Sequence, residues 1–402
     1  MKHFKRAFIL FLALSLIFLV GCEPQELDYL KAPNETQQLF YYSDFNELSQ
    51  FCASENGAFF SDYSNNIYQL PTGDRNLRLL ASEENFAYNH YLYNYFNYNN
   101  ELYFAVKEIQ YSYNGFYDCE PERDFEEYNE PVETWDDNTV IYRLDKNSVT
   151  GTKVFSDIGI KSWFVYGNRI YYLQCGTADN DNLTSVKYYD ISTKENKELF
   201  SKEYIHSFGI VNGNIRFAIE KENYNYSFKE YNFLDGEVKD IYEFEKPGGL
   251  SPTSSAKICY SQKFTSVLYS DEYEVYFYSE DANAIFTVRS NVKLTSVFTC
   301  NNKAYGLGYG NVKIARDEYG NLDTNDDTAT TALSLNNKYV IYEIDLISGE
   351  IKEIYKTRNE IENIYPVNDN LLYFKEYKNS IFNLGTNIYK LENGKTPKKI
   401  NW

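Results

Sequence analysis

A unit of four β-strands recurs along this chain with a period near 45 residues, and this repeat limits the folds open to it. In each copy, a strand with a central aromatic residue leads through an Asn/Gly turn to a second strand of the form I/L-Y-F/Y. A third strand of the form I-Y-x-L-D follows, and a turn near Gly leads to the fourth. The first apolar residue of the second strand falls at Ala58, Leu102, Ile170, Ile215, Ile258, Ala304 and Leu372.

The clearest copy of the outer half of this unit is Lys338–Lys356. Two alternating segments flank Ser348-Gly349 there, which is the pattern of a β-hairpin, because Gly supplies the positive φ that tight turns need. The fifth copy is the least regular, and we place its third strand at Ala284–Val288.

The even spacing of the copies predicts a β-propeller. The spacings are 44, 68, 45, 43, 46 and 68 residues, and four-stranded units of about 40–50 residues are typical of propeller blades. We therefore predict an all-β fold, a single β-propeller of seven four-stranded blades over residues 38–402. A β-sandwich is the alternative that the spacing disfavours. Either Leu39–Tyr42 or Lys398–Trp402 would complete the last blade.

The first 21 residues have the features of a secretory signal, with a positive start, an apolar stretch and the ending Leu19-Val20-Gly21-Cys22. This ending resembles the bacterial lipobox, and the resemblance implies cleavage before Cys22 and attachment of diacylglycerol to its thiol. Residues 22–37 would then form a lipidated tether, and the protein would lie outside the cytoplasm, anchored to a bacterial membrane. The alternatives are an ordinary signal peptide and a membrane anchor.

Charge and cysteine content exclude two classes of function. The formal net charge is −19, and it becomes −22 once the leader with Lys2, Lys5 and Arg6 is removed. Such a surface repels phosphate backbones, so we expect no nucleic-acid partner. Five cysteines follow Cys22 without a C-x-x-C pair, which argues against a zinc site built from thiolates.

On these repeats, the chain from Leu39 to Trp402 resembles bacterial lipoproteins with a propeller body of the YWTD-like or quinoprotein-like kind. The Tyr-Trp-Thr-Asp tetrad itself is absent. The resemblance therefore implies the fold, and no receptor function is carried over with it.

Two long insertions, near residues 110–138 and 309–337, separate the second and third strands of their units. Long loops on a rigid scaffold often carry binding sites. In the first insertion, aromatic rings beside carboxylates could stack on a sugar or meet a cationic partner, and the alternative is a solvated acidic loop. The candidate ligand-binding residues are Tyr113, Tyr117, Trp135, Asp136 and Asp137.

The second insertion places the oxygen ligands of Asp323, Asn325 and Asp327 at alternate positions, as calcium loops do, although the Gly and the distal Glu of an EF-hand are missing. We otherwise expect no cofactor. The innermost strands would line the channel with polar residues that hold a small ligand or ordered water. These residues are Gln50, Asn94, Ser162, Ser207 and Ser296.

No catalytic motif stands out, and His90 and His206 are the only histidines after the leader. We therefore expect a lipid-anchored binding or scaffold module for a protein or glycan, without catalysis. One alternative is a propeller-type carbohydrate-active enzyme, a glycosidase or lyase that uses acidic residues. The other is a structural subunit of a surface assembly.

Overall fold

The described part of the chain folds almost wholly into antiparallel β-sheet. The computed structural model describes residues 41–42, 51–54, 57–61, 67–71, 78–81, 90–98, 101–108, 110–112, 132–134, 138–144, 151–175, 183–246, 256–269, 272–310, 338–380, 383–392 and 395–400. Within these ranges the one helical element is a 3-10 turn, η3 (Glu222–Tyr224). No helix in the same ranges is long and apolar enough to cross a membrane. The predicted all-β class is confirmed.

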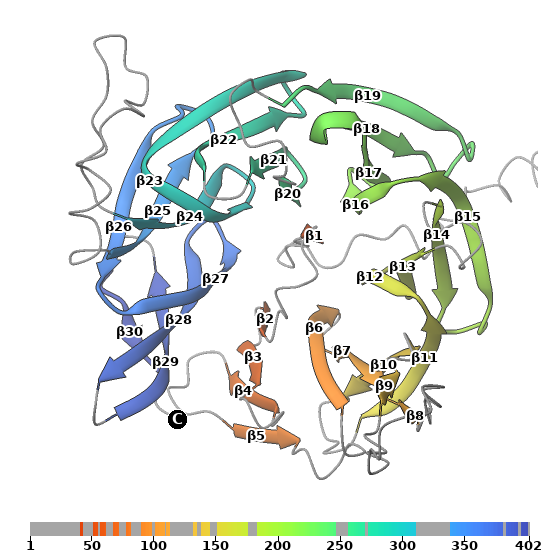
Figure 1. Ribbon diagram of the computed structural model, residues 1–402, viewed down its shortest axis with the longest axis horizontal. Helices are drawn as coiled ribbons and strands as arrows, with labels where there is room; N and C mark the ends of the chain where they lie inside the picture. The colour runs from red at the N-terminus through yellow and green to blue at the C-terminus, as the bar shows by residue number, and fades with distance from the viewer. Residues whose placement is uncertain are drawn as a thin grey trace, which may run out of the picture.

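Five four-stranded sheets stand around a common centre, and in each the strands follow chain order from the centre outwards (Figure 1). This arrangement is that of a propeller. The sheets consist of β2 (Phe51–Ser54), β3 (Gly57–Ser61), β4 (Ile67–Pro71) and β5 (Arg78–Ala81); β6 (His90–Tyr98), β7 (Glu101–Glu108), β10 (Asn138–Leu144) and β11 (Thr152–Ile158); β12 (Ile160–Tyr166), β13 (Arg169–Cys175), β14 (Leu183–Asp190) and β15 (Asn196–Glu203); β16 (Ile205–Val211), β17 (Asn214–Glu220), β18 (Tyr226–Tyr231) and β19 (Val238–Phe244); and β27 (Glu360–Asn368), β28 (Leu371–Ser380), β29 (Asn383–Glu392) and β30 (Lys398–Lys399).

A sixth sheet has eight strands, so the described residues do not form seven separate four-stranded sheets as predicted. Separate sheets do not form here because β23 is one continuous strand. Its first part pairs with β22 and its last part pairs with β24, and a loop was expected between these two parts. The strands, in the order of the sheet, are β1 (Tyr41–Tyr42), β20 (Ala256–Tyr260), β21 (Phe264–Tyr269), β22 (Glu272–Ser279), β23 (Ala284–Thr299), β24 (Lys303–Gly310), β25 (Lys338–Asp345) and β26 (Ile351–Thr357).

The strand register predicted for the fifth copy is wrong. Ile258 lies on β20, the strand before the expected one, and Thr265 on β21 holds the position that Ile170 holds on β13. The error arose because Ile258-Cys259-Tyr260 imitates the apolar-aromatic signature of a second strand. The segment predicted as the third strand, Ala284–Val288, is likewise part of β23, the partner that follows β22.

The two ends of the chain do not share a sheet in the way we had considered for Leu39–Tyr42. β1 pairs with β20, near the centre of the ring, where Tyr41 lies opposite Tyr260 (Figure 1). The C-terminal strand β30 is the fourth strand of the last sheet, so the other alternative is the one observed. Side chains close the ring there, because Tyr365 and Tyr373 of the last sheet pack in one cluster with Ala58 of the first.

Among the described residues, aromatic side chains contribute to the packing between neighbouring sheets. Tyr242 of β19 stacks on Phe228 of β18 at 4.3 Å and on Tyr278 of β22 at 3.8 Å between ring centroids. Such pairs each contribute about 0.5–1.5 kcal/mol beyond the burial of their area. Ring contacts therefore help to hold the sheets together.

The hairpin predicted at Lys338–Lys356 is confirmed as β25 and β26. Asp345 closes its turn by accepting hydrogen bonds from the backbone N–H groups of Ile347 (2.9 Å) and Ser348 (2.8 Å). Gly349 has a φ of +73°, which the turn requires and glycine adopts without strain.

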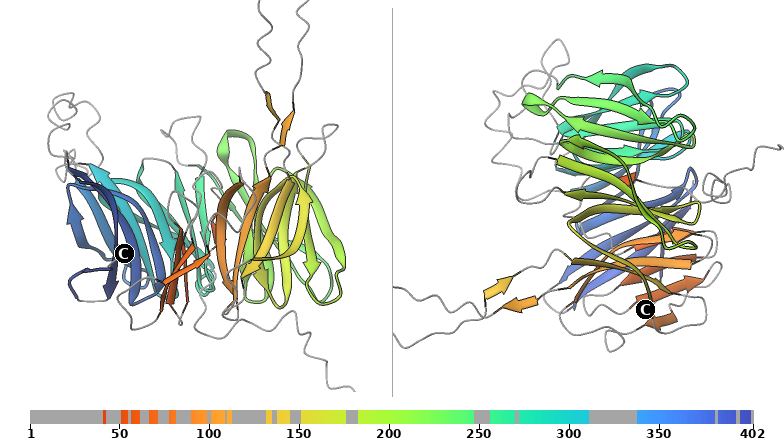
Figure 2. Two further views of the ribbon diagram at one scale, coloured as in Figure 1. Left: turned by 90° about the horizontal axis from the view of Figure 1, so that it is seen from below. Right: turned by 90° about the vertical axis from the view of Figure 1, so that its right-hand side faces the viewer.

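One short ribbon stands apart from the ring. The strands β8 (Gln110–Ser112) and β9 (Val132–Thr134) pair with each other and project from one face (Figure 2). They lie within the first predicted insertion, between β7 and β10. The second predicted insertion lies between Gly310 and Lys338, which pair with each other at the ends of β24 and β25. Both segments therefore start from equivalent ends of their sheets.

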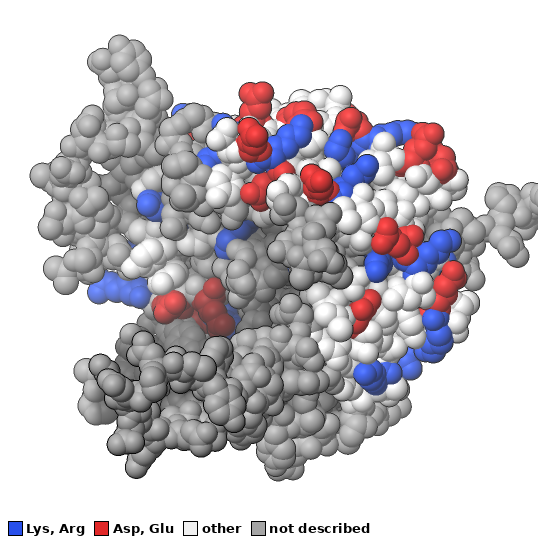
Figure 3. Space-filling model, turned by 45° about the vertical axis from the view of Figure 1, so that its right-hand side comes forward, with Lys and Arg blue, Asp and Glu red and all other residues white. Residues whose placement is uncertain are grey.

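Over the described part of the face in Figure 3, acidic and basic side chains are mixed, and neither sign forms a large area. Several form ion pairs, as Lys221 does with Glu243 at 2.8 Å. Exposed pairs of this kind contribute little to stability, about 0–1 kcal/mol.

Candidate functional site

Most side chains selected from sequence lie outside the described residues. This holds for Cys22, Gln50, Tyr113, Tyr117, Trp135, Asp136, Asp137, Asp323, Asn325 and Asp327. Asn94 lies on β6. Ser162, Ser207 and Ser296 lie on the innermost strands β12, β16 and β23, where each is buried. The Ser207 hydroxyl is 2.9 Å from the hydroxyl of Tyr260 on the next sheet.

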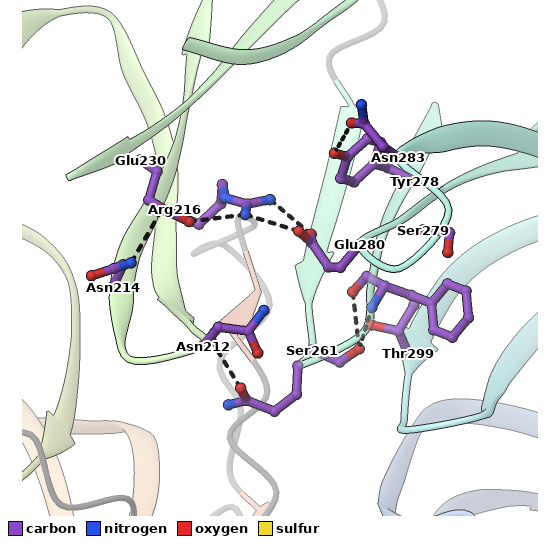
Figure 4. A network of polar contacts seen from close by, with 12 residues as sticks. Asn212, Asn214, Arg216, Glu230, Ser261, Tyr278, Ser279, Glu280, Asn283 and Thr299 are labelled. Carbon is purple, nitrogen blue, oxygen red and sulfur yellow. Dashed lines mark hydrogen bonds and ion pairs between the residues drawn. The ribbon is translucent and has the colours of Figure 1, made fainter. Parts of the chain in front are cut away.

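A buried ion-pair network lies at one end of the β16–β19 sheet, where it meets the eight-stranded sheet (Figure 4). Arg216 donates to both carboxylate oxygens of Glu280, at 2.7 and 2.9 Å, and to Glu230 at 3.0 Å. Burial raises the pKa of Glu280, against the effect of the guanidinium. Because Arg216 holds both carboxylates, we assign this network to the joint between the sheets.

His206 also joins two sheets. Its Nδ1 lies 3.2 Å from a carboxylate oxygen of Glu220, and its Nε2 lies 2.9 Å from the carbonyl oxygen of Ala256 on β20. Both ring nitrogens are thus engaged within the fold. Neither is placed to act as a free base.

The β27–β30 sheet departs from the repeat at two adjacent positions. Lys375 and Glu376 on β28 are 5% and 2% exposed. Register places Leu173, Ala218 and Leu307 of other second strands at the position of Lys375. Burying charge is costly unless it is compensated, so charged residues at core positions point to function. The repeat alignment contains this signal, as a lysine where other second strands have Leu173, Ala218 and Leu307, and our reading of the sequence overlooked it.

Glu376 is held at the junction between the eight-stranded sheet and the β27–β30 sheet. Its Oε1 accepts hydrogen bonds from Thr357 Oγ1 at 2.7 Å and from Asn359 Nδ2 at 2.6 Å. Its Oε2 accepts one from the Tyr355 hydroxyl at 3.3 Å. Burial, and next the charge of Glu376, raises the pKa of Tyr355 to about 12. The carboxylate is therefore fixed in position and stays beside a neutral phenol.

An amide lies next to this carboxylate. Asn387 on β29 is the cross-strand partner of Glu376, so both side chains face the same side of the sheet. It is 6% exposed, and its Nδ2 has no hydrogen-bond partner in the described part of the structure. A buried donor without a partner is uncommon. It would suit a ligand oxygen.

Aromatic rings complete the arrangement. Tyr339 on β25 lies across from Thr357 and packs against Tyr309 on β24, with 4.6 Å between ring centroids. Tyr309 is 38% exposed, beside the Gly310–Lys338 root of the second insertion. Burial, and next the charge of Glu360, raises the pKa of Tyr339 to about 12.

We call this group the Glu376 site. It offers aromatic faces, two carboxylates, amides and a hydroxyl, which are the groups that recognise and act on a sugar. No set of three or more His, Cys, Asp and Glu side chains that could hold a metal occurs among the described residues. The site consists of Tyr309, Tyr339, Thr357, Asn359, Glu360, Glu376 and Asn387.

No model of a known protein family and no curated protein matches this chain. Solved structures do resemble it. Pyrococcus horikoshii acylaminoacyl peptidase matches 90% of this chain and 52% of its own, with 12% identity and a TM-score of 0.52. A prolyl endopeptidase matches over 78% and 43%, with 11% identity and a TM-score of 0.48. An oligogalacturonate lyase from Vibrio parahaemolyticus matches over 87% and 85%, with 10% identity and a TM-score of 0.49.

These likenesses extend to the fold, and the chain spans about half the length of the two peptidases. The first likeness corrects one expectation. We had favoured a non-catalytic binding or scaffold module because the sequence lacks the local motifs of common active sites, whereas the propeller with a TM-score of 0.52 belongs to a peptidase.

Proposed function

We propose that the chain is a carbohydrate-active enzyme and that the Glu376 site cleaves a glycosidic bond. The observation that carries the proposal is the buried carboxylate of Glu376, held by Thr357 and Asn359. A charge kept at a core position implies a task beyond packing.

The residues divide into roles by their surroundings. Tyr309 and Tyr339 offer ring faces on which a sugar can stack, and the Asn387 amide can donate to a sugar hydroxyl. Glu376, fixed by its three donors, would stabilise the positive charge that develops on the sugar ring. Glu360, which is exposed, would exchange the proton with the leaving oxygen.

The test is cleavage of a panel of neutral and uronate polysaccharides by the full chain, followed by the appearance of new reducing ends. Glu376→Gln should lower kcat by about 10²–10⁴-fold, and Tyr339→Ala should mainly raise KM. An unsaturated product would identify elimination, and its absence hydrolysis.

Glu353→Gln is the matched control, because this carboxylate is exposed on β26, where it pairs with Lys356. It should cleave as the parent does. Equal rates for Glu376→Gln and Glu353→Gln would disprove the assignment, as would cleavage of peptides but of no glycan.

We also propose that the ring has seven blades. The support is β23, since β20–β23 and β23–β26 each make a four-stranded set that shares this one long strand. A crystal structure in which the eight strands form one uninterrupted blade would contradict it.

We propose further that Cys22 carries a lipid anchor that holds the protein outside the cytoplasm, and that residues 22–37 are its tether. The support is the lipobox-like ending Leu19-Val20-Gly21-Cys22. Parent protein should enter the detergent phase on partition and Cys22→Ser should not. Equal partition of both would refute the anchor.

A further inference from the structure

Lys375 lies on the other side of β28 from Glu376. Its cross-strand partner Ile388 belongs to the cluster of Tyr365, Tyr373 and Ala58, so the side chain leaves the strand on the face of an apolar packing layer. Its side chain is 6% exposed. In the described part of the chain, its charged partner is Glu362, whose Oε2 lies 4.0 Å from Nζ.

Glu362 owes its position to a bulge. The register of β27 and β28 shifts between Ile361 and Asn363, so Glu362 is an extra residue in the innermost strand. The same kind of register shift occurs around Lys161 and around Thr295, which lie in other innermost strands. Bulges re-aim side chains and are frequent beside active sites. The Glu362 side chain is 39% exposed and so links buried Lys375 to solvent.

The pairing of the two residues is too loose to explain a buried lysine as a structural device. A 4.0 Å separation is at the outer limit of an ion pair, and a leucine or alanine suffices at this position in other sheets. Burial lowers the pKa of Lys375, and Glu362 only partly offsets this. The fraction of Lys375 in the neutral, nucleophilic form is therefore larger than that of an exposed lysine.

We propose that Lys375 is a nucleophilic amine that captures an aldehyde or ketone as an imine, with Glu362 as its proton carrier. The ligand class is a small carbonyl compound, such as the open-chain form of a reducing sugar. This goes beyond the glycosidic cleavage proposed for the Glu376 site and does not depend on it.

The step balances without an added oxidant or reductant. The lone pair of the neutral Nζ forms a bond to the carbonyl carbon, and the nitrogen loses a proton while the oxygen gains one, giving a carbinolamine. Glu362, which has first taken up the proton that the Lys375 ammonium gave up on becoming neutral, then donates it to the hydroxyl, which leaves as water as the C=N bond forms. The positive charge of the protonated imine remains next to the Glu362 carboxylate, which stabilises it.

The test is reductive trapping on the full, folded chain, with glycolaldehyde as the probe and cyanoborohydride as the reductant. Peptide mass mapping follows the adduct at each lysine near neutral pH. Lys375 should be labelled at least about tenfold faster than Lys352, which is exposed on β26. Glu362→Gln should slow the labelling of Lys375 about tenfold and leave Lys352 unchanged.

Labelling of Lys375 no faster than that of Lys352 would overturn the proposal. So would an unchanged rate at Lys375 in Glu362→Gln, because the proton carrier would then have no role. Lys352→Arg is the matched control and should leave the adduct at Lys375 as in the parent. Since these readouts do not involve glycan cleavage, the two proposals can fail independently.

Discussion

Thr357 donates a hydrogen bond of 2.7 Å to the buried carboxylate of Glu376. The bond ties the outermost strand of the eight-stranded sheet, β26, to the second strand of the next sheet, β28. It therefore serves the joint between sheets as well as the candidate site.

Removing that carboxylate should weaken the fold. Glu376→Ala leaves the side chains of Thr357, Asn359 and Tyr355 without their acceptor. We expect a loss of about 3 kcal/mol in the free energy of unfolding, measured by urea denaturation. The control, Glu353→Ala on the exposed side of β26, should change it by less than about 0.5 kcal/mol. A loss no larger than the control's would contradict this account of the joint.

Replacing Lys375 by leucine should stabilise the protein. Leucine fills the corresponding positions Leu173, Leu268 and Leu307, and exchange of a buried charge for an apolar side chain is often favourable. We expect Lys375→Leu to raise the free energy of unfolding by about 1–2 kcal/mol. Lys352→Leu on the exposed surface is the comparison and should be nearly neutral. A marked destabilisation would show that Lys375 is needed for structure.

Loss of Arg216 should be among the most damaging changes. Arg216→Met removes the cation that holds Glu230 and Glu280 and leaves two carboxylates at a buried joint. Breaking a buried pair in this way costs about 3–5 kcal/mol, which a shift in the urea midpoint would report at neutral pH. Lys239→Met, at an exposed pair with Asp235, provides the control. Equal midpoints for the two variants would disprove the role of the network.

Asp190 should make stability depend on pH at the acidic end. Burial alone would raise its pKa, but hydrogen bonds from Ser192, Thr193 and Arg169 lower it from 3.8 to about 2. The folded state binds this proton less tightly than the unfolded chain, so the carboxylate stabilises the fold above pH 3.8. That contribution disappears as the pH falls towards the folded pKa.

The measurement compares the parent with Asp190→Asn in urea from neutral pH downwards. The gap in unfolding free energy should be constant above the unfolded pKa and should narrow below it. If the difference in unfolding free energy between parent and variant is the same at every pH, the hydrogen bonds to the Asp190 carboxylate are not its cause.

Cys259 and Cys300 should not react in the folded protein. Both are fully buried, and burial raises the pKa of Cys259 to about 11 and that of Cys300 above its ordinary value. Since the thiolate is the reactive form, iodoacetamide should modify neither cysteine until urea unfolds the chain. Mass mapping of their peptides before and after unfolding checks this. Modification of either thiol in the native protein would contradict the packing described here.

The strands and their turns could be read from the sequence because their causes are local. Alternation of apolar and polar residues, with glycine where a positive φ is needed, predicted the Lys338–Lys356 hairpin, and six of the seven positions aligned on second strands lie where expected. The exception, Ile258, arose where one local pattern imitates another. The long β23 was missed because the passage from one repeat unit to the next lies inside this strand and has no turn signal in the sequence.

The candidate site belongs to the tertiary structure. Glu376 lies 19 residues after Thr357 and 17 after Asn359 in sequence, and it meets them only because two sheets stand side by side. Alternation tells which face of a strand a residue occupies, but not which side chains come to it from a neighbouring strand or sheet. By itself, the sequence determined the strand-rich, repeated architecture. Only the packing of the sheets decided that Lys375 and Glu376, which look like exposed charges in the printed chain, are buried beside polar partners.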